Sequence, residues 1–203
     1  MICDLNRNNE GLPKSYREGV GFMFSHWGPR LLLAFMLSLV LARAVIGEIG
    51  FIDCMVIAVF FLFRGFMEWL LHMYIFNASP LPIIGWRLRN PISAMHRVHH
   101  CNPKDAESLF FGWKGVFFVL FFSHFFLLIL FQNFSLSISG MIAVSINLLF
   151  YEWFHLVAHS NIEPSWPPFK RAILNHRRHH FVDGQKSMGV TSILADKLFG
   201  TYY

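Results

Sequence analysis

The sequence predicts an all-α membrane protein with four transmembrane helices in two hairpins and a cytosolic helical cap. Three observations lead to this fold class. Hydrophobic residues make up 55% of the 203 residues and charged residues only 14%, with 24 Phe, which is more apolar side chain than a soluble fold of this size can cover. The apolar residues fall into four long segments, and basic residues flank these segments. Lipid as part of the solvent accounts for all three observations.

The four apolar segments have the length that a bilayer requires, which is roughly 20 residues for a helical span. They run over residues 31–47, 51–76, 115–131 and 136–159. The second and fourth are longer than a span needs, and their polar residues gather at their C-terminal ends. We therefore expect their last turns to leave the lipid and enter water.

The connections between these segments predict the topology. Residues 48–50 and 132–137 are short enough for hairpin turns, whereas the polar N-terminal tail (1–29), the stretch 77–114 and the tail after His159 are long and basic. Positively charged loops stay in the cytoplasm. We expect an integral, multi-pass membrane protein with both termini and the long basic segments on the cytoplasmic side.

The net charge of +5 has two interpretations, a nucleic-acid partner or a membrane face. The positive residues flank apolar runs, and the basic segments are short and carry no readout motif for nucleic acid. We therefore expect membrane lipids and no nucleic acid as partners, and a single membrane-embedded domain over residues 1–203.

The three cysteines, Cys3, Cys54 and Cys101, do not form a CxxC pair. Their odd number argues against a disulfide framework and favours a reducing cytosol around the polar segments. Cys101 directly follows His100, but we expect it to be an incidental thiol.

Histidines form the strongest pattern in the chain. HRVHH (96–100) and HRRHH (176–180) each place three histidines at i, i+3 and i+4, which is one face of a helix. HLVAH (155–159) and EWLLH (68–72) place polar pairs at i and i+4 at the ends of the fourth and second segments. All four groups fall on the predicted cytoplasmic side, and we expect nine histidines to converge: His72, His96, His99, His100, His155, His159, His176, His179 and His180.

Nine imidazoles exceed the four ligands that one zinc ion takes. They suit two metal ions with open positions, and imidazole is a ligand for iron, zinc or copper. A single HxxHH in a basic loop is often only a charged surface, but two copies with two further polar pairs favour a di-metal site. His124, in the third segment, is expected to make an interhelical hydrogen bond, and His26 to lie at the membrane interface.

Acidic residues near the histidines are candidates for supporting roles, because metal-bound histidines donate their second nitrogen to a carboxylate or a carbonyl. The candidates are Glu68, Glu152, Asp105 and Asp183. For Glu68 and Glu152 an ion pair with Arg64 or another basic side chain stays open.

Four stretches resemble, in order, the histidine boxes of the fatty acid hydroxylase/sterol desaturase superfamily of membrane di-metal oxygenases. EWLLHMYIFN (68–77) is similar to the HxxxxH box, HRVHHCNPKD (96–105) to the HxxHH box, YEWFHLVAHS (151–160) to the HxxxH box and NHRRHHF (175–181) to the final HxxHH box. The ending MGVTSILADKLFGTYY resembles the closing stretch of that superfamily. The resemblance covers about residues 60–203.

This resemblance implies two iron ions held by the nine histidines, with zinc possible in purified protein. It implies hydroxylation or desaturation of a lipid C–H bond with dioxygen and electrons from an external donor. The first box departs from the pattern, since Asn77 replaces its last histidine. Asn77 then holds a metal-bound water, or one metal is weakened and the protein is a slow or inactive relative that keeps its metal. A metal-handling membrane protein is a further alternative.

The spacing in the first box also makes a structural prediction. His72 and Asn77 are five residues apart, about 140° round an α-helix. The helix must end or bend there for both to face one site.

Overall fold

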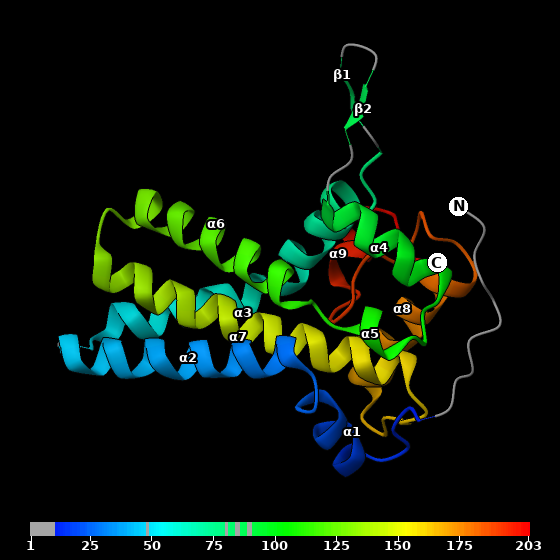
Figure 1. Ribbon diagram of the computed structural model, residues 1–203, viewed down its shortest axis with the longest axis horizontal. Helices are drawn as coiled ribbons and strands as arrows, with labels where there is room; N and C mark the ends of the chain where they lie inside the picture. Colours follow the sequence, from blue (N-terminus) through cyan, green and yellow to red (C-terminus); the bar gives the residue numbers. More distant parts are fainter. Residues whose placement is uncertain (1–10, 48, 80, 84–85, 89–90) are drawn as a thin grey trace. The chain divides into compact units, whose positions relative to one another are not determined.

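The computed structural model describes residues 11–47, 49–79, 81–83, 86–88 and 91–203 (Figure 1). Its elements are α1 (Tyr16–Met23), α2 (Trp27–Ile46), α3 (Phe51–Leu71), the π-helix η1 (His72–Phe76), β1 (Leu81–Ile83), β2 (Trp86–Leu88), α4 (Pro91–Cys101), α5 (Ala106–Leu109), α6 (Trp113–Phe131), α7 (Phe134–His159), α8 (Pro167–Phe181) and α9 (Leu194–Leu198).

Four helical stretches are long and apolar enough to cross a membrane: Trp27–Ile46, Phe51–Phe76, Ala106–Phe131 and Phe134–His159. They confirm the four predicted spans. The first begins four residues earlier than predicted, and the third also takes in the short α5 ahead of α6. The predicted pairing of the spans into hairpins remains a prediction.

The chain divides into two compact units, and the single-domain expectation remains a prediction. One unit comprises residues 1–22, 65–109 and 154–203, and the other comprises residues 23–64 and 110–153. We call them the histidine unit and the span unit, after their contents. The helices α3 and α7 contribute residues to both.

The span unit has a small apolar core between its helices. Leu32 of α2, Leu127 of α6 and Met141 of α7 are buried within it. Much of the outer surface is aromatic, and Phe117, for example, is 68% exposed. A surface of this composition is stable against lipid and unstable against water.

A buried ion pair joins helices of the span unit, and the sequence reasoning missed it. The Nη2 of Arg43 on α2 lies 2.9 Å from Oδ1 of Asp53 on α3. The Oγ of Ser139 on α7 donates to the same oxygen at 2.6 Å. A charge inside a bilayer is costly unless it is paired, so these three residues tie α2, α3 and α7 together.

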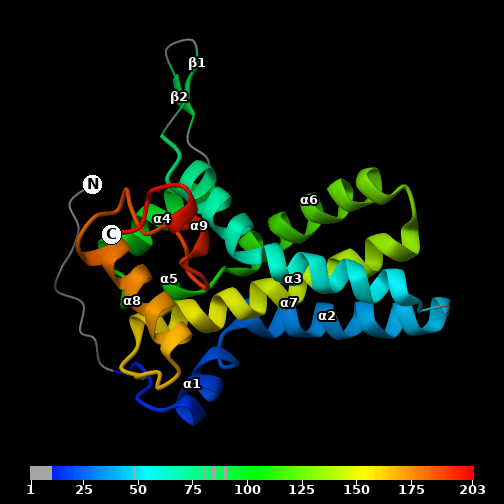
Figure 2. The same cartoon turned by 180° about the vertical axis from the view of Figure 1, so that it is seen from behind.

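The histidine unit contains α1, η1, β1, β2, α4, α5, α8 and α9 with the C-terminal ends of α3 and α7 (Figure 2). Its most buried side chains include Leu156, Ile173 and Val190. The polar tail predicted for residues 1–29 contains α1 and the first residues of α2. Ahead of α1, Leu12 is buried, and the backbone N–H of Asn161 donates to Pro13 O. Residues 1–10 of that tail lie outside the described residues.

The described structure also contains one pair of strands, which an all-α prediction did not include. β1 and β2 are antiparallel, with Leu81 opposite Leu88, Pro82 opposite Arg87 and Ile83 opposite Trp86. A proline is tolerated in a two-stranded ribbon because each strand has a free edge. The helical spans and the helices that carry the histidine words are as predicted.

Candidate metal centre

The nine predicted histidines come from four elements of the histidine unit. η1 carries His72, α4 carries His96, His99 and His100, the last two turns of α7 carry His155 and His159, and α8 carries His176, His179 and His180. Both HxxHH words are helical, so their three imidazoles share one face. Pro167, in the first turn of α8, starts that helix with a φ angle already suited to it.

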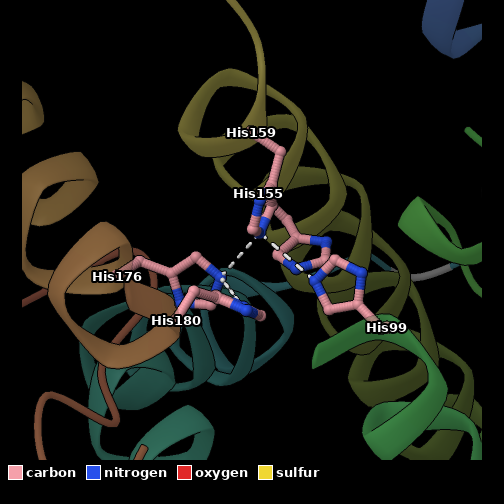
Figure 3. Close-up of side chains that lie close together, drawn as sticks. All are labelled: His99, His155, His159, His176 and His180. Atoms are coloured by element: carbon pink, nitrogen blue, oxygen red, sulfur yellow. Dashed lines mark hydrogen bonds between the residues drawn. The ribbon is translucent and has the colours of Figure 1, made fainter. Parts of the chain in front are cut away.

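Five histidines form the first group: His99, His155, His159, His176 and His180 (Figure 3). One nitrogen of each lies within 4.8 Å of one nitrogen of every other. The Nε2 atom of His159 is 3.2 Å from that of His99 and 3.3 Å from that of His176. The five-histidine group therefore joins α4, α7 and α8 at one point.

Four histidines form the second group: His72, His96, His100 and His179. Their Nε2 atoms follow one another at 3.0 Å from His72 to His96, 2.9 Å from His96 to His100 and 3.0 Å from His100 to His179. The four-histidine group joins η1, α4 and α8.

The two groups adjoin, because the ring of His100 stacks on the ring of His180 with centroids 4.2 Å apart. The two HxxHH words therefore face each other, as a di-metal site requires. Neither group contains a carboxylate or a cysteine from the described part of the chain.

The donor set fits two metal ions. Nitrogen ligands bind zinc at roughly 2.0–2.1 Å, so two of them lie about 2.9 Å apart at a right angle and about 3.3 Å apart at the tetrahedral angle. The Nε2 distances above, 2.9–3.3 Å, fall in this range. A neutral imidazole has only one N–H, so a ring whose single N–H already donates to another group has no proton left for a hydrogen bond within the cluster.

Three backbone carbonyls orient histidines of the two groups through the other ring nitrogen. Nδ1 of His72 lies 2.7 Å from Met188 O, and Nδ1 of His179 lies 2.8 Å from Lys186 O. Nδ1 of His155 lies 2.8 Å from Leu109 O. A carbonyl can only accept, so each Nδ1 carries the proton and each Nε2 presents a lone pair to its group.

The environment keeps the imidazoles neutral. Burial, followed by the neighbouring imidazoles, holds the pKa of His96, His99, His176 and His180 well below the ordinary value of a histidine. The same causes lower the pKa of His100 to about 3. Neutral imidazole is the form that binds metal, so the site is ready for ions at neutral pH.

The acidic candidates contact other partners. Glu68 accepts hydrogen bonds from Thr191 N at 2.9 Å and Thr191 Oγ1 at 2.7 Å. Glu152 accepts from Phe111 N at 2.8 Å, and Asp183 accepts from Gln185 N at 2.9 Å. The backbone N–H of Asp105 donates to Asn102 O. Their supporting roles at the metal site remain predictions.

Asn77 lies at the end of η1, where the helix changes as predicted. Its N–H donates to His72 O at 3.0 Å, the i to i+5 bond of a π turn. Its side-chain amide lies 3.4 Å from Gly184 O and 3.3 Å from Met188 Sδ. Asn77 therefore contacts the loop that supplies the carbonyls for His72 and His179.

The remaining histidines lie outside both groups. Nδ1 of His124 on α6 is 3.4 Å from Ser137 Oγ on α7, which confirms the interhelical hydrogen bond. The ring of His26 contacts Phe110 with centroids 4.8 Å apart.

Two structural residues of the site were missed. Arg177, inside the second histidine word, donates from Nε to Ala158 O at 2.8 Å and from Nη2 to Ser160 O at 3.1 Å. It thus caps the end of α7 beside His159. Asp196, inside the C-terminal stretch, is fully buried and accepts several hydrogen bonds. The sequence signal that could have found them is their position, since Arg177 lies within the second HxxHH word and Asp196 lies within the closing stretch MGVTSILADKLFGTYY.

The cysteine expectation was wrong in one respect. Cys101 is disulfide-bonded, whereas Cys54 is a free thiol. Disulfides are rare in a reducing cytosol, so the cytoplasmic position of the site stays a prediction.

Two comparisons with known proteins found matches. A family model described as fatty acid hydroxylase matches residues 57–201, which include all nine histidines. A solved structure of full-length Scs7p, in which only the hydroxylase domain is visible, matches with a TM-score of 0.64 and 20% identity over 84% of this chain and 64% of that chain. The chain thus spans less than two thirds of that protein. No curated protein matches.

Proposed function

The chain belongs to the fatty acid hydroxylase family, and from this premise we propose that it is a membrane-bound di-iron oxygenase that hydroxylates a lipid C–H bond. Dioxygen and electrons from an external donor are its co-substrates. The single observation that carries the proposal is the meeting of nine histidine side chains in two adjoining groups of five and four. The family match and the four apolar helices support the further part of the proposal, that the enzyme is an integral membrane protein.

Iron, when bound by the nine histidines, supplies the activation of dioxygen and the attack on an unactivated C–H bond. The chain supplies the ligands in their neutral form and fixes their direction. Carbonyls of Met188, Lys186 and Leu109 hold the Nδ1 protons of three ligands. Burial of His72, His99 and His176 to 3% exposure or less keeps bulk water away from the nitrogens.

The lipid partner follows from the position of the ligands along the chain. His72 lies in the last two turns of the candidate span Phe51–Phe76, and His155 and His159 lie in the last two turns of the candidate span Phe134–His159. Ligands at the ends of two spans suit a substrate whose chain lies in the bilayer and whose reacting carbon reaches its surface. Hydroxylation, rather than desaturation, is the reaction that the family model favours.

One observation favours a second candidate, a metal-binding membrane protein without oxygenase activity. The first box ends in Asn77, and the second group has four histidines instead of five. An amide is a weak ligand for iron, and the Asn77 amide lies beside Gly184 and Met188. Structural zinc in one or both groups would meet this description.

The decisive experiment counts metals and then measures chemistry. The protein is purified in nanodiscs, stripped with a chelator, reloaded with ferrous iron and analysed for iron per chain. Oxygen uptake is then measured with a chemical reductant. Mass spectra are also recorded for lipids from cells with and without the chain. We expect two irons per chain, oxygen uptake and a lipid product heavier by one oxygen.

Matched variants assign these signals to the site. His99→Ala removes a ligand from the five-histidine group and is expected to lower the iron count, whereas His124→Ala, outside both groups, keeps two irons. Two bound irons with neither oxygen uptake nor a lipid shift would support the metal-binding protein instead. Fewer than two irons in wild-type protein would remove the di-iron proposal.

A further inference from the structure

Two histidines of the four-histidine group contact the loop that follows α8, which is close to His179 in the sequence and far from His72. Lys186 O and Met188 O accept the Nδ1 protons of His179 and His72, at 2.8 and 2.7 Å. These two carbonyls are two residues apart. The loop thus orients two of the four ligands of this group, one from α8 and one from η1.

Asp196 holds this loop in place. Its Oδ1 accepts from Met188 N and its Oδ2 from Gly189 N, both at 2.8 Å. Oδ1 also accepts from Thr201 Oγ1 at 2.6 Å, and Oδ2 from Asn175 Nδ2 at 2.8 Å. Four donors therefore converge on one fully buried carboxylate, and each oxygen accepts two of them.

The backbone around Asp196 is built for this contact. A Cβ on Gly189 would lie 2.0 Å from Ser192 O and 2.9 Å from Asp196 Oδ2, so only glycine lets the chain approach the carboxylate this closely. Glu68 holds the next part of the segment through Thr191. Carboxylates therefore fix the segment from Met188 to Thr191 from two sides.

We propose that Asp196 is a positioning residue for the metal ion of the four-histidine group, acting through the Met188 peptide on His72 and through the same loop on His179. This inference rests on the proposed di-metal function. Met188 is the central link, because its N–H donates to Asp196 while its carbonyl accepts from His72. Partners of metal-bound histidines change metal affinity by about 10–100-fold when they are removed.

The five-histidine group has different supports, so the effect of Asp196 is selective. His155 is oriented by Leu109 O, and the end of α7 with His159 is capped by Arg177. Asn175, the neighbour of His176, contacts Asp196 and Gly189 O, but no hydrogen bond joins Asp196 or its loop to the ring of His176 itself among the bonds that hold this loop. Loss of Asp196 thus loosens one ion and leaves the other.

Asp196→Asn is the sharpest variant because it keeps the shape of the side chain. Every acceptor site of the carboxylate faces a donor, so the new amide N–H₂ meets two donors in either orientation and repels them. Thr201→Val is the milder companion, since it leaves the carboxylate charged and removes one of its four donors, together with the acceptor of Trp69 Nε1 at 2.8 Å. Ile173→Val, a buried change on α8 without a hydrogen bond to the loop, is the control for general loss of stability.

The experiment measures zinc on stripped full-length protein in nanodiscs, using Zn²⁺ alone with a competing indicator. Wild type is expected to bind two ions. Asp196→Asn is expected to bind one ion with wild-type affinity and the second about 10–100-fold more weakly. Thr201→Val should weaken the same ion several-fold, and Ile173→Val should leave both affinities unchanged.

Cobalt loading gives a second readout that a merely structural role would not move. Co²⁺ in two histidine sites gives two visible-absorption contributions, and Asp196→Asn is expected to lose one of them at limiting cobalt. Two unchanged affinities in Asp196→Asn, or an equal weakening of both ions, would overturn the inference. If Asp196→Asn does not fold, the selective loss in Thr201→Val decides the question in the same way. Failure of wild type to bind two ions would instead count against the proposed function itself.

Discussion

Removing the Arg177 side-chain charge should destabilise the histidine unit by about 2–3 kcal/mol. Its guanidinium donates to Ala158 O at 2.8 Å and Ser160 O at 3.1 Å, while Val157 O at 3.5 Å is too distant to add much. Hydrogen bonds from a charged donor contribute about 1.5–3 kcal/mol each. Arg177 is only partly buried, so water recovers part of the roughly 3–6 kcal/mol of the two bonds.

The variants Arg177→Met and Arg177→Lys separate charge from geometry. Methionine keeps the apolar stem and loses both hydrogen bonds, whereas lysine keeps the charge but cannot span two carbonyls as the planar guanidinium does. We expect lysine to lose about half as much stability as methionine. Arg171→Met makes the same charge change on the same helix at an exposed position and is expected to stay within about 0.5 kcal/mol of wild type.

The assay is equilibrium unfolding of metal-free protein in mixed micelles with increasing dodecyl sulfate, followed by circular dichroism. Metal-free protein is used because bound ions would add their own stabilisation. An Arg177→Met protein as stable as Arg171→Met would refute the capping role. A zinc titration of the same samples should show weaker binding at the five-histidine group, since the cap lies beside His159.

The other predictions concern the spans, the C-terminal segment and pH. Asp53→Leu alone leaves the buried Arg43 charge without its carboxylate and should cost about 3–5 kcal/mol. The double variant with Arg43→Met should recover most of this loss in the same unfolding assay, and a double variant as unstable as the single one would contradict this. Gly65→Ala places a Cβ 2.6 Å from the Cβ of Ser192 and should destabilise by about 1–3 kcal/mol, measured as a lower melting temperature. The pKa of His100 is lowered to about 3 in the folded protein, whereas a histidine in the unfolded chain titrates near 6.5. Below pH 6.5 the unfolded chain therefore binds more protons than the folded protein. The metal-free protein should lose stability steadily as the pH falls from about 6.5 towards 3. A stability that is flat over this range would contradict the buried, neutral state of the histidines.

Local spacing was enough to predict which nine histidines lie together. In a helix the i, i+3 and i+4 positions share a face whatever surrounds them, so HRVHH and HRRHH each had to present three imidazoles together. The run of apolar residues likewise predicted the four helices, since length and hydropathy are properties of the segment alone. The five-residue gap from His72 to Asn77 correctly required a change of helix, which is the π turn of η1.

Other features depended on contacts between distant parts of the chain. Backbone carbonyls lie beside Nδ1 of His72, His155 and His179, and every residue has a carbonyl, so no residue type marks these positions. The acidic residue nearest to this role is Asp196, which acts through a peptide and carries no metal-ligand spacing of its own. The pairing of Arg43 with Asp53 and the strand pair β1–β2 also left no periodic signal.

By itself the sequence determined which side chains are apolar, which helices they form and which nine imidazoles are available, because these depend on residue type and on the repeat of a single helix. The tertiary structure alone decided how the imidazoles divide into a group of five and a group of four. Each HxxHH word is divided between the two groups: His99, for example, belongs to the five-histidine group, whereas His96 and His100 belong to the four-histidine group. Only the packing of α4 against α7, α8 and η1 determines which ring nitrogens meet. The reason is that a contact between two side chains depends on where both of their helices lie, and the sequence of one helix does not determine this.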